Sequence, residues 1–511
     1  MQKSESPDLA YSAERGLKLL LFLFGLGAIG LFYFIAFRRL TYPLPLEWAE
    51  GGVLDMMRRV AYHQPLYVAP SKDFVPFLYT PVYFYIGAGL GHLTGVNVVT
   101  LRLLSILATT GCLTLIFGLV RRNTGDGFSA WMACGLFAAL YGQSTGWFDL
   151  ARVDMLYLFF LLLAIDLAQR GFSVWSAIAF VVAFQTKQSA AAVAVFVLMH
   201  EIRRPRRLIE GLGVFGSGVA LSSWVIDRES HGWYRYYTVF LPAHQAWNGH
   251  KLVTFLLRDI VDPLGVAIVF LLVGAGLHMS EASIDRGKTY FLVFTTIGVT
   301  LSSLTARLHM GGSINVTLPL YAWICILFGL CLHLVLSQVK RVPGTLPPWL
   351  GVATLAACFV QFVHLMYLPG EYVPTASQRA DAVRVLDKVS ALPGKIFVLH
   401  HVIDAGSASK QGFAGGMELW DVLRADQGEA GQRLKADLIR SFQSHEYAGV
   451  LSEGALDGML PEEEQFLKDV TAAAALAYPR QERLLSPSEA KDFFANSITS
   501  KIKPQFLYLP R

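Results

Sequence analysis

The sequence predicts a mainly α-helical, polytopic membrane protein with a small α/β domain at its C-terminus. Apolar residues make up 54% of the 511 residues and charged residues 16%, a composition typical of chains that lie in lipid. Hydrophobic runs of about 20 residues, the length that crosses a bilayer, fill most of the chain before Pro369. The composition of the chain after Pro369 indicates a water-soluble segment. We therefore expect a membrane domain at residues 1–369 and a soluble domain at 370–511.

Composition also excludes several function classes. The net charge is only +5, and the basic residues form short clusters between apolar runs, where they orient helices rather than bind nucleic acid. The five cysteines lie in hydrophobic segments without metal-ligand spacing, so we expect neither disulfides nor structural zinc. The sequence contains no Walker motif, so the use of ATP is not suggested. The first apolar run, residues 17–37, is too long for a signal-peptide core and is interpreted as an uncleaved span.

Lys/Arg-rich short loops stay cytoplasmic, which allows the spans to be threaded. With the N-terminus inside, the first outer loop covers about residues 38–97, and the short run 77–93 lies in the interface or re-enters. Arg38 and Arg39 depart from the charge pattern, whereas the later basic clusters fall inside. About eleven spans result, and the C-terminal domain lies outside. The expected spans are 17–37, 98–120, 128–143, 155–167, two short halves around 186–188, 208–226, 262–278, 289–306, 316–337 and 347–367.

The polar remainder of the chain changes its periodicity. Apolar residues recur at helical spacing over residues 380–392, and a strand-like run follows at 395–399. A helix near 432–443 and strands near 447–451 and 505–509 complete the expected α/β domain.

The first outer loop carries the strongest candidate site. Glu47 and Glu50 are spaced i, i+3, which predicts that both carboxylates lie on one face of a helix, where one could act as a general base. The alternative is an interfacial helix start, where the helix dipole favours acids. Arg58, Arg59 and Tyr79 in the same loop could bind phosphate or sugar hydroxyls.

Later segments add ionisable residues to the same side of the membrane, where charges at membrane depth suggest a site. Asp149, Arg152 and Asp154 lie at an outer junction of two spans, either in a substrate role or as an internal ion pair. Lys187 lies between two half-length apolar runs, either near an anion or as a snorkelling helix end.

Two further candidates follow in the outer loops. Arg235 lies in an aromatic stretch, and a guanidinium suits bidentate phosphate binding. His309 is more typical of a structural role. Carboxylates and cations around one outer cavity fit a substrate that has a phosphate and a group to be deprotonated, and a phosphoryl-linked lipid is the natural donor.

The order of these motifs resembles the GT-C superfamily of membrane glycosyltransferases, which includes protein O-mannosyltransferases of glycosyltransferase family 39 and the lipid A aminoarabinose transferase. The resemblance covers most of the membrane domain and implies a GT-C-like bundle. The matching elements are residues 47–51, Arg58-Arg59, Gln64-Pro65-Leu66-Tyr67, residues 79–83, Leu101-Arg102-Leu103, Arg152-Val153-Asp154 and Thr186-Lys187.

The resemblance implies inverting transfer of a sugar from a polyprenyl-phosphate donor to an extracytoplasmic glycan, lipid or protein acceptor. We favour a bacterial inner membrane over the endoplasmic reticulum as the protein's location. The resemblance also implies that Glu47 or Glu50 is the base, that Lys187 and Arg235 hold the donor phosphate, and that Asp154 is the second acid. Some relatives use a divalent metal. No cofactor is certain here; Asp149, Asp154 and the first-loop glutamates could hold a divalent metal, but it is not favoured because cations are already present.

Two other classes of function remain as alternatives. A lipid or sugar transporter or flippase would also need buried charges, but such proteins more often show paired repeats with charges near mid-membrane. A non-catalytic membrane scaffold with an outer binding domain is the third interpretation.

Overall fold

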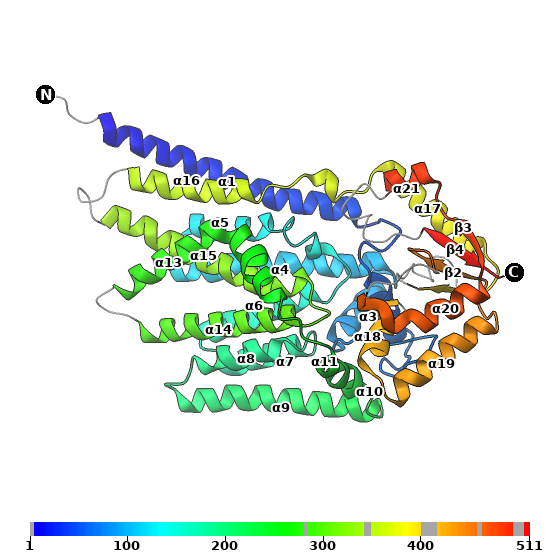
Figure 1. The fold of residues 1–511 in the computed structure, drawn as a ribbon. Coiled ribbons are helices and arrows are strands. Elements are labelled where there is room, and N and C mark those ends of the chain that lie inside the picture. Colours follow the sequence, from blue (N-terminus) through cyan, green and yellow to red (C-terminus); the bar gives the residue numbers. More distant parts are fainter. Residues whose placement is uncertain are drawn as a thin grey trace.

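The computed structural model describes residues 5–280, 285–341, 349–399, 416–456, 462–493 and 505–510. Long helices run side by side in an elongated bundle, and the C-terminal segment packs at one end of it (Figure 1). The first helix begins at the opposite end. The bundle helices are α1 (Glu5–Arg39), α4 (Val98–Thr124), α5 (Gly127–Ala139), α6 (Asp154–Gln169), α7 (Ser173–Phe184), α8 (Ala190–Met199), α9 (Pro205–Glu229), α13 (Asp262–Met279), α14 (Arg286–Leu308), α15 (Leu318–Arg341) and α16 (Trp349–His364).

The apolar surface of the bundle agrees with a membrane environment. Seven helical segments of the described chain are long and apolar enough to cross a bilayer, and α5, α7 and α8 are shorter apolar helices. Large apolar side chains such as Ile209, Leu221 and Leu272 are exposed on the outside, which lipid favours and water does not. The expected multi-pass membrane protein is confirmed, while the number of about eleven spans stays a prediction.

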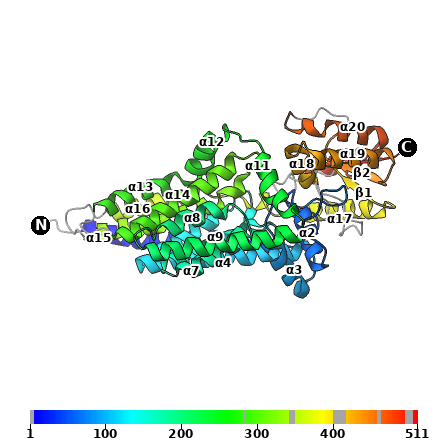
Figure 2. The same ribbon diagram turned by 90° about the horizontal axis from the view of Figure 1, so that it is seen from below.

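The first loop folds into two helices at the end that carries the C-terminal segment. These are α2 (Glu50–Ala61) and α3 (Val82–Thr94), which lie at the same end as α18 (Gly416–Ala425) and α19 (Glu429–Gln443) of the C-terminal segment (Figure 2). The start of α3 is fixed to the break between α7 and α8, because Val82 N donates to Gln185 O at 2.8 Å and Thr80 Oγ1 to Phe184 O at 2.8 Å. The run 77–93 therefore lies at this end of the bundle, next to Lys187.

Short helical turns make up most of the other loops at this end. The segment after α9 contains α10 (Trp233–Arg235), the π-helical η2 (Tyr236–Phe240), α11 (Leu241–His244), α12 (Lys251–Val253) and the π-helical η3 (Thr254–Val261). Two 3-10 turns, η1 (Trp147–Asp149) and η4 (Ile314–Thr317), precede α6 and α15.

The C-terminal segment combines helices with a four-stranded sheet. Strand β1 (Ile396–Val398) pairs in parallel with β2 (Gly449–Ser452), and β4 (Phe506–Leu509) pairs antiparallel with both β2 and β3 (Arg480–Arg483). Three strands lie where the sequence predicts them, whereas β3 was not predicted. The helices are α17 (Ala376–Ala391), α18 (Gly416–Ala425), α19 (Glu429–Gln443), α20 (Lys468–Ala477) and α21 (Pro487–Phe493), with 3-10 turns η5 (Pro369–Glu371) and η6 (Glu462–Leu467).

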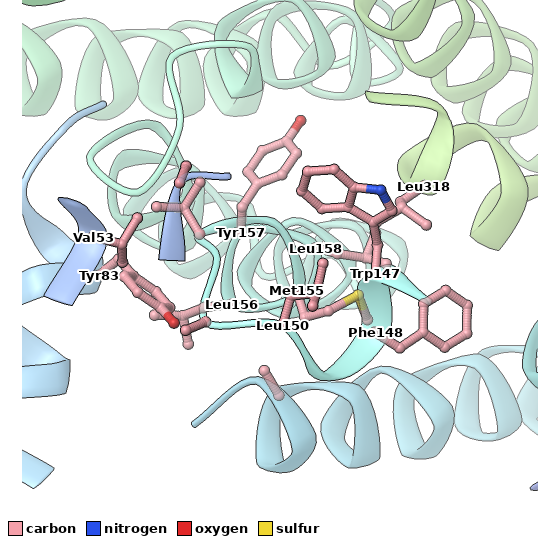
Figure 3. Packing of buried hydrophobic residues seen from close by; sticks show 14 of the residues in the cluster. Val53, Tyr83, Trp147, Phe148, Leu150, Met155, Leu156, Tyr157, Leu158 and Leu318 are labelled. Atoms are coloured by element: carbon pink, nitrogen blue, oxygen red, sulfur yellow. The ribbon is translucent and has the colours of Figure 1, made fainter. Parts of the chain in front are cut away.

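Aromatic packing fixes the segment that joins α5 to α6. Phe148 stacks on Phe137 with ring centroids 4.8 Å apart. Figure 3 shows Phe148, Leu150 and Met155 packed together. Buried aromatic rings supply large contact areas at defined geometry. The polar residues between Phe148 and Met155 are therefore held in fixed positions at the end of the bundle.

Candidate active site

Glu47 and Glu50 do not share a helical face, so that prediction is wrong. Helix α2 begins at Glu50, and Glu47 lies in the turn before it, where its carbonyl accepts from Glu50 N at 3.2 Å. The two carboxylates consequently have different partners, Arg152 for Glu47 and Arg102 for Glu50.

The Glu50 carboxylate is saturated with hydrogen bonds. It accepts from Arg102 Nε at 3.1 Å and Nη2 at 2.7 Å, from Ala151 N at 2.7 Å and from Leu46 N at 2.6 Å. Burial opposes ionisation of this side chain, but the Arg102 charge and these hydrogen bonds outweigh it and lower the pKa of Glu50. Glu50 thus ties the first loop to α4 and to the α5–α6 connection.

A second buried pair lies beside it, in which both oxygens of the carboxylate are hydrogen-bonded, although Arg39 Nη1 has no partner within the described residues. Arg39 Nε and Nη2 donate to the Asp149 carboxylate, Nη2 also donates to Gly146 O, and Tyr141 Oη donates to Asp149 Oδ1 at 3.1 Å. Asp149, a predicted substrate-binding residue, is 1% exposed, and its partners are protein groups. The pair also explains why Arg39 departs from the loop-charge pattern: its charge is neutralised by Asp149.

A third group of charges is less completely paired. Arg152 Nη1 donates to Glu47 Oε2 at 2.9 Å and Nη2 to Tyr79 Oη at 2.7 Å, while Arg152 Nε lies 3.9 Å from Asp154 Oδ2. The guanidinium also lies over the Trp147 ring, 5.0 Å from its centroid. These contacts bring together four of the residues that the sequence singles out.

Lys187 completes this cluster from the break between α7 and α8. Its Nζ donates to Asp154 Oδ1 at 2.7 Å, and Asn315 Nδ2 donates to the same oxygen at 2.9 Å. Asp154 Oδ2 and Arg152 Nε are buried and have no hydrogen-bond partner within the described ranges. We call Glu47, Arg152, Asp154 and Lys187 the open cluster, because buried polar atoms without partners mark places where a ligand can supply them.

The remaining predicted residues make their contacts elsewhere. Arg58 pairs with Asp55 at 3.0 Å. Arg59 donates to a backbone carbonyl and lies over an aromatic ring. His309 Nδ1 lies 3.0 Å from a glutamine oxygen. Arg235 is 73% exposed and lines a separate cavity of about 230 Å³.

The open cluster does not suit a divalent metal. Such ions need several oxygen ligands around one point, whereas the carboxylates of Glu47 and Asp154 are each paired with a cation. Within the described residues, no three His, Cys, Asp or Glu side chains gather in a way that could hold a metal.

Two acids of α18 were missed by sequence reasoning. Glu418 is buried against Gly52 of α2, where an added methyl group would overlap its carboxylate. Asp421 Oδ1 accepts from Gln245 Nε2 at 2.9 Å. Both lie more than 350 residues after α2 in the chain, and neither has a local motif around it, so no sequence pattern indicates their place.

Comparisons with known proteins agree with this fold. The structure of ArnT from Cupriavidus metallidurans bound to undecaprenyl phosphate is similar with a TM-score of 0.58 and 11% identity, over 94% of this chain and 98% of that one. Apo ArnT from the same organism is similar with a TM-score of 0.55 and 12% identity, over 87% and 94% of the two chains. No curated protein sequence matches the chain.

The fold and the family comparison point to one class, because the chain is similar in fold to ArnT and matches the model of a glycosyltransferase family over part of its length. The expected resemblance to that superfamily is therefore confirmed. More particularly, the model of Glycosyltransferase family 87 matches residues 77–306. That range contains Tyr79, Arg152, Asp154 and Lys187, although not Glu47.

Proposed function

We propose that the protein transfers a sugar from a polyprenyl-phosphate donor to an extracytoplasmic glycan, lipid or protein acceptor, with inversion at the anomeric carbon. The observation that carries the proposal is the open cluster, which places a carboxylate beside two cations in a buried site. A bound undecaprenyl phosphate in ArnT, a protein of similar fold, supports the lipid donor.

Glu47 is the better candidate for the base. All four hydrogen bonds of Glu50 occupy its two oxygens, so an acceptor would have to displace protein partners. The hydrogen bonds of Glu47 within the described ranges, from Arg152 and Ala49, both go to Oε2. Its Oε1 is then free to receive a proton from an acceptor hydroxyl.

The reaction follows from this placement. Glu47 Oε1 takes the hydroxyl proton as the acceptor oxygen forms a bond to the anomeric carbon. The bond from that carbon to the phosphate oxygen breaks on the opposite face, and its electron pair leaves with the polyprenyl phosphate. Lys187 and Arg152 stabilise the charge on the departing phosphate, and in doing so exchange part of their contact with Asp154 and Glu47 for the ligand.

The test compares Glu47→Gln with wild type in cells that lack the protein. We expect cells that lack the protein to accumulate a polyprenyl-phosphate sugar. Wild-type protein returned to these cells should consume it, and the Glu47→Gln variant should consume it at least about 100-fold more slowly. Mass spectrometry of extracted lipids measures this, and the melting temperature of Glu47→Gln shows whether it is folded. Clearance by Glu47→Gln at the wild-type rate would rule Glu47 out as the base.

The same material separates transfer from transport. A transporter or flippase moves the lipid-linked sugar with its glycosidic bond intact, whereas transfer releases polyprenyl phosphate and links the sugar to a new oxygen. NMR of product and donor then compares the two anomeric configurations. Retention of configuration would contradict the inverting mechanism.

Membrane orientation has its own test. Leu476 is 82% exposed in the C-terminal segment, and the Arg206 side chain is 91% exposed at the start of α9. A membrane-impermeant thiol reagent added to intact cells should label Leu476→Cys and not Arg206→Cys. Four of the native cysteines are buried and Cys331 is half-buried, so they should give little background. The reverse labelling would invert the proposed orientation.

A further inference from the structure

Helix α18 of the C-terminal segment contacts both the first loop and the segment that follows α9. Glu418 lies against Gly52 of α2, Asp421 accepts from Gln245, and Asp426, just after α18, accepts from Tyr236 Oη at 2.6 Å. The helix therefore bridges the first loop and the segment that follows α9. Glu418 and Asp421 lie close enough to the open cluster to interact electrostatically with Arg152.

Glu418 is an unusual side chain for this position. It is 2% exposed, and its Oε2 has no hydrogen-bond partner in the described part of the chain. A buried carboxyl oxygen without a partner destabilises the fold, and a leucine or methionine would fill the same space without that cost. The missing partner is consequently expected from a bound molecule.

The surroundings of Glu418 indicate which chemical group that molecule presents. Burial, together with the nearby charges of Asp55 and Asp421, raises the pKa of Glu418 well above its usual value, although Arg152 opposes this. A protonated carboxyl both donates and accepts a hydrogen bond. A hydroxyl group can make both of these hydrogen bonds. An anionic phosphate would instead be repelled by the acids of α18 and attracted to Lys187 and Arg152.

We propose that Glu418 binds a hydroxyl group of the acceptor, so that α18 selects the acceptor while the open cluster holds the donor phosphate. This inference rests on the proposed glycosyl transfer. It gives the C-terminal segment a direct part in substrate recognition, with Gly52 present because any side chain there would displace the Glu418 carboxylate.

The experiment uses the full-length purified protein, lipid-linked sugar from cells that lack the protein as donor, and an envelope extract of those cells as acceptor. Initial rates of sugar transfer are measured at a series of dilutions of the extract. Glu418→Ala should raise the KM for the extract at least tenfold, with a smaller fall in kcat. Glu418→Gln, which can also donate and accept, should restore KM to within about threefold of wild type.

Two controls separate recognition from folding and from donor binding. Glu429→Ala alters an exposed acid of α19, 85% accessible, and should leave KM unchanged. The affinity of Glu418→Ala for undecaprenyl phosphate should equal that of wild type, as measured by the shift in melting temperature on adding this lipid.

The outcomes distinguish the two proposals. If wild type transfers sugar but Glu418→Ala shows an unchanged KM, or loses undecaprenyl phosphate binding to the same extent as acceptor affinity, the role of Glu418 is wrong and glycosyl transfer stands. If wild type transfers no sugar from the lipid donor, the proposed function itself is wrong.

Discussion

The end of the bundle that carries the C-terminal segment holds two groups of buried charges, and they differ in how completely they are hydrogen-bonded. The Glu50–Arg102 and Arg39–Asp149 pairs, which we call the closed pairs, leave no carboxylate oxygen without a partner. The open cluster, by contrast, leaves Asp154 Oδ2 and Arg152 Nε unpartnered within the described residues, with a 3.9 Å gap between them.

The difference separates structural charges from charges that can bind a ligand. Burial does not distinguish them, since Glu50 and Asp154 are 0% and 1% exposed. The carboxylates of the closed pairs can bind a ligand only by breaking protein hydrogen bonds, whereas the Asp154 carboxylate of the open cluster has an oxygen that lacks a partner within the described residues. The closed pairs instead fix the loops that hold Glu47 and Arg152 in place.

Breaking a closed pair should have the largest effect on stability. Glu50→Gln removes the negative charge opposite Arg102, whose guanidinium is buried and also donates to backbone carbonyls. We expect a loss of about 3–5 kcal/mol, seen as a strongly lowered melting temperature or failure to accumulate in membranes. Glu47→Gln is the matched control and should destabilise the protein less, because Arg152 keeps a second carboxylate, that of Asp154, 3.9 Å away. Equal melting of both variants would contradict the distinction.

Removing a cation from the open cluster should affect binding more than folding. Lys187→Met deletes a charge that would meet the donor phosphate, and hydrogen bonds to charged groups contribute about 1.5–3 kcal/mol. Undecaprenyl phosphate should therefore bind at least about tenfold more weakly, as measured by ligand-induced stabilisation. Because the variant leaves Asp154 with one fewer partner, Lys187→Met/Asp154→Asn serves as the charge-balanced control. Wild-type affinity in both variants would remove Lys187 from the phosphate site.

Asp421 of α18 should have a smaller effect on stability, and this effect should depend on pH. Burial is the main cause that raises the pKa of Asp421 from 3.8 to about 6, while Arg424 and Gln245 act in the opposite direction. Its contribution to stability is therefore fully present below pH 3.8 and is lost as pH rises through about 6. Asp421→Asn should melt at a higher temperature than wild type near neutral pH, and the difference should close toward pH 4. A pH-independent difference would contradict this assignment.

Much of this arrangement follows from the sequence because its signals are local or set by topology. Loop charges place Glu47, Asp154 and Lys187 on one side, and the hydrogen bond from Val82 to Gln185 shows why the run 77–93 stays with them. Short apolar runs indicate β1, β2 and β4. They do not indicate β3, because all four of its residues, Arg480–Arg483, are exposed and none is apolar.

The roles within the site are less predictable, because they depend on contacts between distant segments. The sequence offers Glu47 and Glu50 as equivalent acids, and only their partners, Arg152 and Arg102, distinguish them. In the sequence, Glu418 is likewise an ordinary acid of an amphipathic helix. Only its contact with Gly52 in the fold distinguishes it. Proximity across more than 350 residues has no signal in a single sequence.

Arg235 should show the smallest effect and tests where the phosphate site ends. The sequence places it with Lys187 at the donor phosphate, but its side chain is 73% exposed, and its nearest carboxylate, Asp227, lies 3.9 Å away. Exposed charges usually contribute at most about 1 kcal/mol, so Arg235→Ala should weaken undecaprenyl phosphate binding by less than about fivefold. A loss as large as that of Lys187→Met would mean that Arg235 reaches the phosphate. The segment from α10 to α11 would then have to close over the donor, and the cavity beside Gln188 would belong to the same site as the open cluster.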